Sequence, residues 1–194
     1  PLVCDASSDM FARPWPFADH AIVYAGAQKN LGPSGLALVI IRKDMLEKSC
    51  RETIDLLDYR KQAAQGSRLN TPPVFGVYCM GLVFDWIAAQ GGLIGIAERN
   101  TAKAKVIYDA IDGSGGFYRG HAQMDSRSEM NVTFRLPNED LEKTFVSEAK
   151  SHDMDGLKGH RSVGGIRASI YNAFPIEGCQ ALAGFMSDFA TKNG

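Results

Sequence analysis

Two apolar runs flank the stretch Tyr24-Ala25-Gly26-Ala27-Gln28-Lys29-Asn30-Leu31-Gly32-Pro33-Ser34-Gly35, which decides the fold. Residues 21–24 and 36–41 are short and apolar, and this pattern predicts two strands. The turn between them places Lys29 among small residues, where we expect the side chain to be held close to the backbone and shielded from water. A crowded amine can form a Schiff base with a carbonyl, whereas most lysines are solvated surface charges.

Asp5 is the second candidate residue. It follows the apolar residues 1–4 and precedes small residues with hydroxyl groups, a pattern typical of the carboxyl end of a buried parallel strand. Open α/β sheets bind their ligands at that end. An acid there can pair with the protonated ring nitrogen of pyridoxal phosphate (PLP) and keep the ring electron-poor. The alternative is that Asp5 caps the helix or turn that follows.

Five blocks of sequence make the chain recognisable. They are residues 4–8 (Cys-Asp-Ala-Ser-Ser), 25–30 (Ala-Gly-Ala-Gln-Lys-Asn), 70–73 (Asn-Thr-Pro-Pro), 127–131 (Arg-Ser-Glu-Met-Asn) and 157–169 (Leu-Lys-Gly-His-Arg-Ser-Val-Gly-Gly-Ile-Arg-Ala-Ser). Through these blocks the chain resembles the phosphoserine aminotransferase family, fold-type I PLP enzymes of the class V aminotransferase group. Because members of that family are longer, we expect this chain to be a fragment that corresponds to their C-terminal half.

The resemblance implies an α/β fold with two regions. Residues 1–92 would be the second half of the large PLP-binding domain, and residues 93–194 a small C-terminal α+β domain. The patterns predict three strands in the first region, then a long loop over 59–70 and a buried helix over 75–89. For the second region they predict strands at 130–136 and 166–171 and helices at 94–111, 140–151 and 176–191.

The composition is that of an ordinary globular protein, with 194 residues, 45% hydrophobic, 22% charged and a formal net charge of -1. This near-neutral charge gives no electrostatic case for binding nucleic acid or membranes, and no apolar run is long enough to span a bilayer. The four cysteines, Cys4, Cys50, Cys79 and Cys179, are scattered without metal-binding spacing. We therefore expect free buried thiols in a reducing cytoplasm and no metal site.

Asn70 and Thr71 precede two prolines that stiffen the chain. Their amide and hydroxyl groups can donate hydrogen bonds to a phosphate, but they can equally serve as caps at the start of a helix. The resemblance implies that this pair contacts the cofactor phosphate of the other subunit of a homodimer. It also implies that Gln28 is a phosphate ligand.

His160, Arg161 and Arg167 form the other candidate group. Glycines bracket the first two in a loop, and Arg167 opens the strand that follows. Arginine matches a carboxylate or phosphate with two parallel hydrogen bonds, although loop arginines are often only surface charges paired with nearby acids such as Asp153 or Asp155. The resemblance implies that Arg167 binds the substrate α-carboxylate and that His160 and Arg161 bind the phosphate or the glutamate side chain.

The implied reaction is a PLP-dependent transamination in serine biosynthesis, between glutamate and 2-oxoglutarate on one side and phosphoserine and 3-phosphohydroxypyruvate on the other. Lys29 would hold PLP, and its freed amine would move the proton at the substrate α-carbon, while Asp5 keeps the ring nitrogen protonated. Two alternatives stay open. One is another class V PLP enzyme, such as a cysteine desulfurase, and the other is an inactive or merely dimerising fragment.

Overall fold

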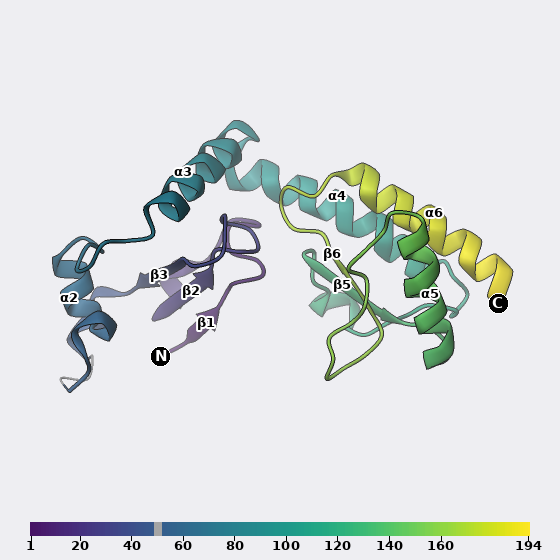
Figure 1. The fold of residues 1–194 in the computed structure, drawn as a ribbon, viewed down its shortest axis with the longest axis horizontal. Helices are drawn as coiled ribbons and strands as arrows, with labels where there is room; N and C mark the ends of the chain where they lie inside the picture. Colours follow the sequence, from purple (N-terminus) through teal and green to yellow (C-terminus); the bar gives the residue numbers. More distant parts are fainter. Residues whose placement is uncertain (49–51) are drawn as a thin grey trace. The chain divides into compact units, whose positions relative to one another are not determined.

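The computed structural model describes residues 1–48 and 52–194 (Figure 1). The chain divides into two compact units, Pro1–Gly95 and Ile96–Gly194. The first unit contains β1 (Val3–Asp5), β2 (Ile22–Gly26), β3 (Ala37–Ile41), α1 (Lys43–Glu47), α2 (Tyr59–Ala64) and α3 (Val74–Ala89). From α4 (Gly92–Asp112) onward follow β4 (Arg119–Gly120), β5 (Asn131–Arg135), α5 (Glu139–Ser151), β6 (Ile166–Ser169) and α6 (Ile176–Asn193). The 3₁₀ helices are η1 (Phe17–Asp19), η2 (Asp55–Leu57) and η3 (Met124–Ser126).

The described part of the first unit holds one sheet in the order β1-β2-β3. β1 and β2 run parallel, with Asp5 opposite Tyr24, and β3 is antiparallel to β2. The three predicted strands are therefore confirmed. Val23 and Ala25 of β2 belong to the core, so the carboxyl ends of β1 and β2 lie side by side above a packed base.

Three details of the first unit differ from the prediction. The stretch 59–70 was expected to be a loop, but it begins with α2, because the Asp58 side chain accepts a hydrogen bond from Arg60 N at 2.9 Å and caps the helix. β1 was expected to be buried, yet Val3 is 52% exposed, since β1 is an edge strand of the sheet. Cys50 lies outside the described residues.

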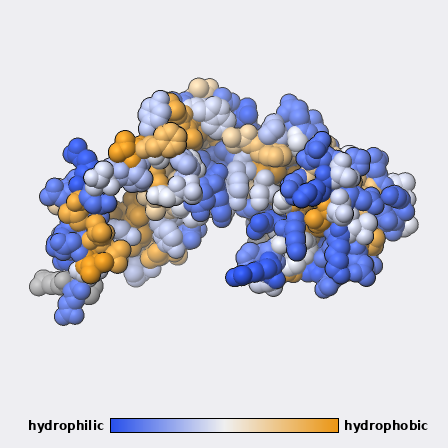
Figure 2. Space-filling view, viewed as in Figure 1, coloured by the Kyte–Doolittle hydropathy of each residue, from blue (hydrophilic) through white to orange (hydrophobic). Residues whose placement is uncertain are grey.

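Helix α3 is present as predicted, but the expectation that it is buried is wrong. Only Gly76, Met80 and Ile87 are buried along its length. Most of its other large side chains are exposed, among them Phe75 at 74% and Tyr78 at 63%. Figure 2 shows hydrophobic surface over this helix. An apolar helix with most of its faces open to solvent is typical of a protein that buries the helix against another chain or segment.

The second unit packs three helices on one face of the antiparallel sheet β4-β5-β6. The predicted strands and helices of this region are confirmed, and β4 is additional. Residues on one face of β5 and β6, such as Val132 and Phe134, join buried side chains of α4, α5 and α6 in a single core. Phe134 meets Phe145 of α5 edge to face at 5.9 Å. Charged and polar residues therefore gather on the opposite face of the sheet, where Arg167 lies.

Lys103 of α4 is a buried charge, only 3% exposed. Its Nζ donates to the carbonyl oxygens of Ile170 at 3.1 Å, Tyr171 at 2.7 Å and Asn172 at 3.3 Å. Burial lowers the pKa of Lys103 to about 8, Cys179 acts in the opposite direction, and the positive charge of Arg99 lowers the pKa as well. The lysine thus ties α4 to the turn that follows β6.

The described cysteines, Cys4, Cys79 and Cys179, are free, as predicted, but only Cys179 is buried. Within the described residues no single helix is long and apolar enough to cross a membrane. The pair α3 and α4 passes that test by length and composition only when both are counted across a bend of 81°.

Candidate active site

Asp5 ends β1 and makes its closest contacts with Ser7. The Asp5 Oδ1 atom accepts hydrogen bonds from Ser7 N at 2.9 Å and from Ser7 Oγ at 2.6 Å. The hydrogen bond from the Ser7 hydroxyl has the largest effect on the pKa of Asp5 and lowers it, and the bond from the Ser7 N–H lowers it next most strongly. Burial acts in the opposite direction, but the pKa stays below its usual range. A hydrogen bond from Tyr24 and the positive charge of Lys29 lower it further. Asp5 therefore caps the turn that follows it, as one prediction had it, and this turn keeps its carboxylate ionised.

Lys29 lies in a turn directly after β2. Leu31 N donates to Ala27 O at 3.0 Å, so the chain makes one helical turn around the lysine. Asn30, only 6% exposed, anchors this turn, because its Nδ2 donates to Met10 O at 3.3 Å. The backbone that carries Lys29 is thus held both by the hydrogen bond within its own turn and by the bond from Asn30 to the segment after β1.

The expectation that Lys29 is shielded from water is wrong, because its side chain is exposed. The residues beneath the turn, Ala25 and Ala27, are fully buried but small, and no described residue covers its outer side. Gln28 is also exposed, and its side chain folds back over Gly26, where a Cβ atom would lie 2.6 Å from Gln28 Oε1. The amine of Lys29 and the amide of Gln28 are therefore accessible to a ligand at the carboxyl ends of β1 and β2.

Asn70 and Thr71 do not cap a helix. Helix α3 begins at Val74 with Pro73 as its N-cap residue and has no side-chain capping bond. Both Asn70 and Thr71 are exposed, and Asn70 Nδ2 donates to Thr71 O at 3.2 Å. The capping alternative is wrong, and the Thr71 hydroxyl has no partner among the described residues.

His160 and Arg161 lie on a loop whose ends are joined by glycines. Gly159 N donates to Gly165 O at 2.8 Å, and a Cβ atom at position 159 would lie 2.0 Å from Gly164 O. Only glycine lets the two backbone segments approach so closely. The two ends of the loop are therefore held together, and the side chains of His160 and Arg161 between them are exposed to solvent.

The chemistry of His160 follows from its neighbour Ser162. His160 Nδ1 lies 2.7 Å from Ser162 Oγ and accepts from Ser162 N at 3.3 Å. A backbone N–H can only donate, so Nδ1 is the acceptor and the neutral ring carries its proton on Nε2. His160 therefore offers an N–H donor to an anionic ligand.

His160 and Arg161 line a cleft of about 710 Å³ with Lys158 and two lysines of α5, Lys143 and Lys150. Within the described residues Arg161 has no ion pair, so the predicted alternative of pairing with a nearby acid is not found. Asp155 instead lies 3.7 Å from the ammonium of Lys150. Glu139 and Glu142 also line the cleft, but its lysines and arginines outnumber them, so the cleft suits an anion.

Arg167 lies apart from this cleft, on β6 and directly opposite Thr133 of β5. It is half-buried on the polar face of the sheet, next to the network in which Asn131 Oδ1 accepts from Ser169 Oγ at 3.0 Å. Its Nε atom is buried and has no hydrogen-bond partner among the described residues. An unpaired buried guanidinium nitrogen can take a carboxylate acceptor.

Sequence reasoning missed two residues that hold these groups in place. In the sequence Ser7 is one of several small hydroxyl residues after a strand, yet in the fold its hydroxyl contacts Asp5 directly. Arg135 of β5 donates from Nη1 to Val163 O at 2.9 Å and from Nε to Glu142 Oε1 at 2.6 Å, so it anchors the loop of His160. Only the pairing of distant segments gives Arg135 this role, and no local pattern indicates it.

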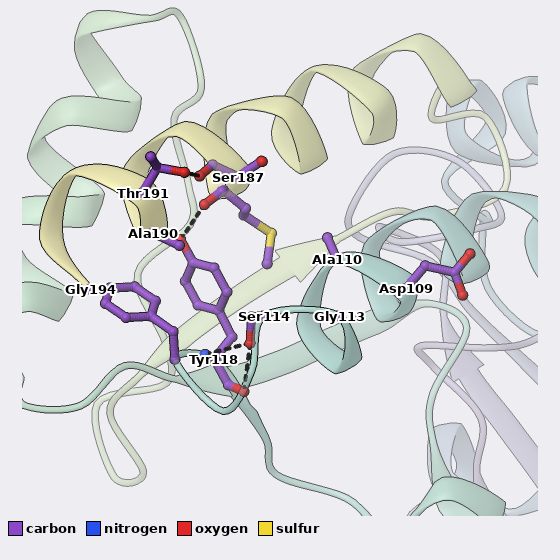
Figure 3. Close-up of a pocket in the computed structure, with 11 residues that line it drawn as sticks. Asp109, Ala110, Gly113, Ser114, Tyr118, Ser187, Ala190, Thr191 and Gly194 are labelled. Atoms are coloured by element: carbon purple, nitrogen blue, oxygen red, sulfur yellow. Dashed lines mark hydrogen bonds between the residues drawn. The ribbon is translucent and has the colours of Figure 1, made fainter.

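A further pocket of about 520 Å³ lies between α4 and α6 and contains none of the predicted residues (Figure 3). Its titratable side chains are already paired, because the Tyr118 hydroxyl donates to Met186 O at 2.8 Å and Lys105 Nζ donates to Asp109 Oδ2 at 2.6 Å. Burial raises the pKa of Tyr118. This pocket therefore lacks the free acid or base that catalysis needs.

The first unit instead combines an ionised carboxylate and an accessible primary amine at neighbouring strand ends. This donor set fits PLP, since the carboxylate can accept from a protonated ring nitrogen while the amine reaches the aldehyde of the same ring. Within the described residues no cluster of three or more His, Cys, Asp or Glu side chains has the geometry of a metal site.

The chain is similar to known proteins along its whole length. It is 60% identical to the phosphoserine aminotransferase of Herpetosiphon aurantiacus over all of its residues, which cover 54% of that relative. It superimposes on the solved phosphoserine aminotransferase of Bacillus circulans subsp. alkalophilus with a TM-score of 0.96 at 52% identity, covering 100% of this chain and 54% of the other. A PLP-bound phosphoserine aminotransferase from Trichomonas vaginalis matches with a TM-score of 0.90 at 39% identity, covering 96% and 53%.

The chain thus spans about half the length of the curated relatives that it matches. The model of the class-V aminotransferase family matches residues 1–182. Since this match covers more than half of the chain, the protein belongs to the class-V aminotransferases.

Proposed function

We propose that this chain acts, as part of a full-length protein, in PLP-dependent transamination between phosphoserine and 2-oxoglutarate in serine biosynthesis. The observation that carries the proposal is the placement of the Asp5 carboxylate and the Lys29 amine at the adjacent ends of β1 and β2. The high identity to proteins named phosphoserine aminotransferase supports it. A cytoplasmic location is part of this proposal and agrees with the free thiols of the described cysteines.

Three residues of the chain have defined tasks toward the cofactor in this proposal. Lys29 holds the cofactor and, once its amine is free, carries the proton to and from the substrate α-carbon. Asp5 accepts a hydrogen bond from the protonated ring nitrogen, and Gln28 donates its amide to the phosphate. Bound PLP supplies an electron sink for the negative charge that develops on the α-carbon.

Covalent labelling tests the assignment of Lys29. Full-length protein incubated with PLP and reduced with borohydride should carry the cofactor on the peptide that contains Lys29. A Lys29→Ala variant should remain unlabelled, and Lys43→Ala, which removes an exposed lysine of the same unit, serves as the matched control. A label on Lys43 or any other lysine would refute the proposed role.

The two arginines are proposed to bind different ends of the substrate. Every amino donor and keto acceptor carries an α-carboxylate, so Arg167→Ala should weaken both half-reactions together, by about 1.5 to 3 kcal/mol for a lost charged hydrogen bond. Arg161→Ala should penalise phosphoserine and glutamate but spare alanine, which lacks a distal anion. An equal loss for alanine and phosphoserine in Arg161→Ala would contradict the distal-anion role of Arg161.

The proposal includes a homodimer in which Asn70 and Thr71 contact the cofactor phosphate of the partner. The exposed pair and the exposed apolar side chains of α3 directly after it support an interface here, because two identical sites completed by one segment require a two-fold contact. The exposed faces of α3 would be buried in that contact and against the rest of the full-length protein.

Two alternative functions are less well supported by the described residues. A cysteine desulfurase needs a reactive thiolate. Burial is the main effect that raises the pKa of both Cys4 and Cys179, and this makes both thiols poor nucleophiles. An inactive fragment is the other alternative. Purified chain that shows the visible absorbance of bound PLP would exclude it.

A further inference from the structure

One hydroxyl group connects the two halves of the proposed site. Ser7 Oγ accepts a hydrogen bond from Gly26 N at 3.0 Å and donates one to Asp5 Oδ1 at 2.6 Å. Because a backbone N–H can only donate, the oxygen of Ser7 must accept from Gly26, and its single proton is directed to Asp5. The two bonds therefore fix the direction of the hydroxyl without ambiguity.

The two partners of Ser7 belong to different strands. Asp5 is the last residue of β1, and Gly26 is the last residue of the parallel strand β2. Gly26 also begins the turn that carries Lys29. Ser7 itself is half-buried in the loop after β1, where Ala6 N donates to Tyr24 O at 2.8 Å. The serine thus joins the loop after one strand to the loop after the next.

The rigid shape of PLP makes this connection consequential. Its ring nitrogen and its aldehyde carbon lie at opposite ends of one aromatic ring, so the groups that bind them must keep a fixed separation. In this chain those groups are Asp5 and Lys29, and Ser7 bonds both to Asp5 and to the first residue of the lysine turn. Loss of the Ser7 hydroxyl would remove this link between Asp5 and the lysine turn, and the backbone bond from Ala6 N to Tyr24 O would remain.

We propose that Ser7 is a positioning residue that orients Asp5 toward the cofactor ring nitrogen and holds the lysine turn in register with it. This inference rests on the function proposed above and deepens it. Ser7 touches neither the substrate nor the reacting atoms, and it acts through Asp5 and Gly26.

The charge of Asp5 supports the assignment. The Ser7 hydroxyl is the largest of the effects that lower the pKa of Asp5, ahead of the Ser7 N–H, Tyr24 and Lys29. The other titratable group facing Asp5 is Cys4, whose thiol is uncharged at neutral pH because its pKa is raised. An alanine at position 7 would keep the N–H bond and lose the hydroxyl bond, so the pKa of Asp5 would rise toward its ordinary value.

The test compares PLP binding by full-length apo-protein in four forms: wild type, Ser7→Ala, Ser7→Thr and Ser8→Ala. Visible absorbance of the bound cofactor gives the dissociation constant between about pH 2.5 and about pH 8, a range that includes the ordinary pKa of an aspartate, about 3.9. Loss of a hydrogen bond to a charged group should weaken binding about tenfold or more in Ser7→Ala. The acid-side loss of binding should also begin at a higher pH in this variant.

The other variants separate the role of the hydroxyl from general structural effects. Ser7→Thr keeps the hydroxyl and should restore binding and the wild-type pH profile. Ser8→Ala should match the wild type, because the Ser8 hydroxyl makes no hydrogen bond within the described residues. Ser7→Cys, of nearly the same size as serine, replaces Ser7→Ala if alanine prevents folding, and should show the same loss.

Binding by Ser7→Ala within about twofold of the wild type at every pH would overturn the inference. The inference would also be overturned if Ser7→Ala lost affinity for PLP, if Ser7→Thr did not restore that affinity, and if the pH at which binding is lost on the acid side stayed the same as in the wild type. Failure of the proposed function is a different result, since wild-type protein would then bind no PLP at all.

Discussion

Replacement of Gly159 by alanine should open the base of the loop that carries His160 and Arg161. A Cβ atom at this position would lie 2.0 Å from Gly164 O and 2.6 Å from Gly165 O, distances that no real side chain tolerates. Both contacts are with backbone atoms, so no flexible side chain can move aside. The two segments must separate.

The size of the effect follows from the bonds that the separation breaks. Gly159 N donates to Gly165 O at 2.8 Å, and Arg167 N donates to Leu157 O at 2.8 Å. Loss of these two backbone bonds and the added strain should lower the free energy of unfolding by about 2 to 4 kcal/mol. Because Arg167 N is one of the donors, the start of β6 should shift as well.

The assay is chemical unfolding followed by circular dichroism, with Gly184→Ala as the matched control. Gly184 is an exposed residue of α6, and nothing lies within 4 Å of the position that its Cβ would take. Alanine should therefore stabilise that helix by about 0.5 to 1 kcal/mol. A Gly159→Ala protein as stable as the wild type would show that the close approach of the two segments is not required.

Three further predictions concern other parts of the chain. Between about pH 8 and about pH 10.4, the unfolding free energy of the wild type should rise relative to that of Lys103→Met, because in this range Lys103 binds more protons in the unfolded than in the folded protein. Unfolding free energies measured across this pH range check the prediction, with the exposed Lys105→Met as control. Asn138→Ala should lower the unfolding free energy by about 1 kcal/mol in thermal melts, because its side chain caps α5. Mixing full-length Lys29→Ala chains with Thr71→Glu chains should restore activity to one site per dimer, whereas sites built from a single chain would stay inactive.

Much of the fold could be predicted because the relevant signals are local. Short apolar runs indicated β2 and β3, and helical periodicity indicated α4, α5 and α6. The failure at α2 has a local cause too, since six polar and small residues give no apolar stripe, and the helix depends on one capping carboxylate, that of Asp58. Exposure of α3 could not be predicted, because hydrophobicity indicates that a surface is to be covered but not what covers it.

The residues of the candidate site also divide into those with a local sequence signal and those that depend on contacts between distant segments. Asp5 and Lys29 each follow a strand and are identified by local pattern. The roles of Ser7 and Arg135 depend on hydrogen bonds to residues 19 and 28 positions away, Gly26 and Val163, which only the folded chain brings near. The residues proposed to act chemically can thus be found from a local sequence pattern, whereas those proposed to position them can be found only from contacts between distant segments.

Arg167 illustrates why a site keeps a locally unfavourable arrangement. The core occupies one face of the small sheet, so a guanidinium on β6 can lie only on the other, half-buried face. There its Nε is withdrawn from solvent without an acceptor among the described residues, which costs about 1 to 3 kcal/mol. Replacement by an apolar residue would remove that cost, and a purely structural role would not require an arginine here. In the proposed role of Arg167, a substrate carboxylate would supply the missing acceptor, and the cost present in the free protein would then contribute to affinity for the ligand.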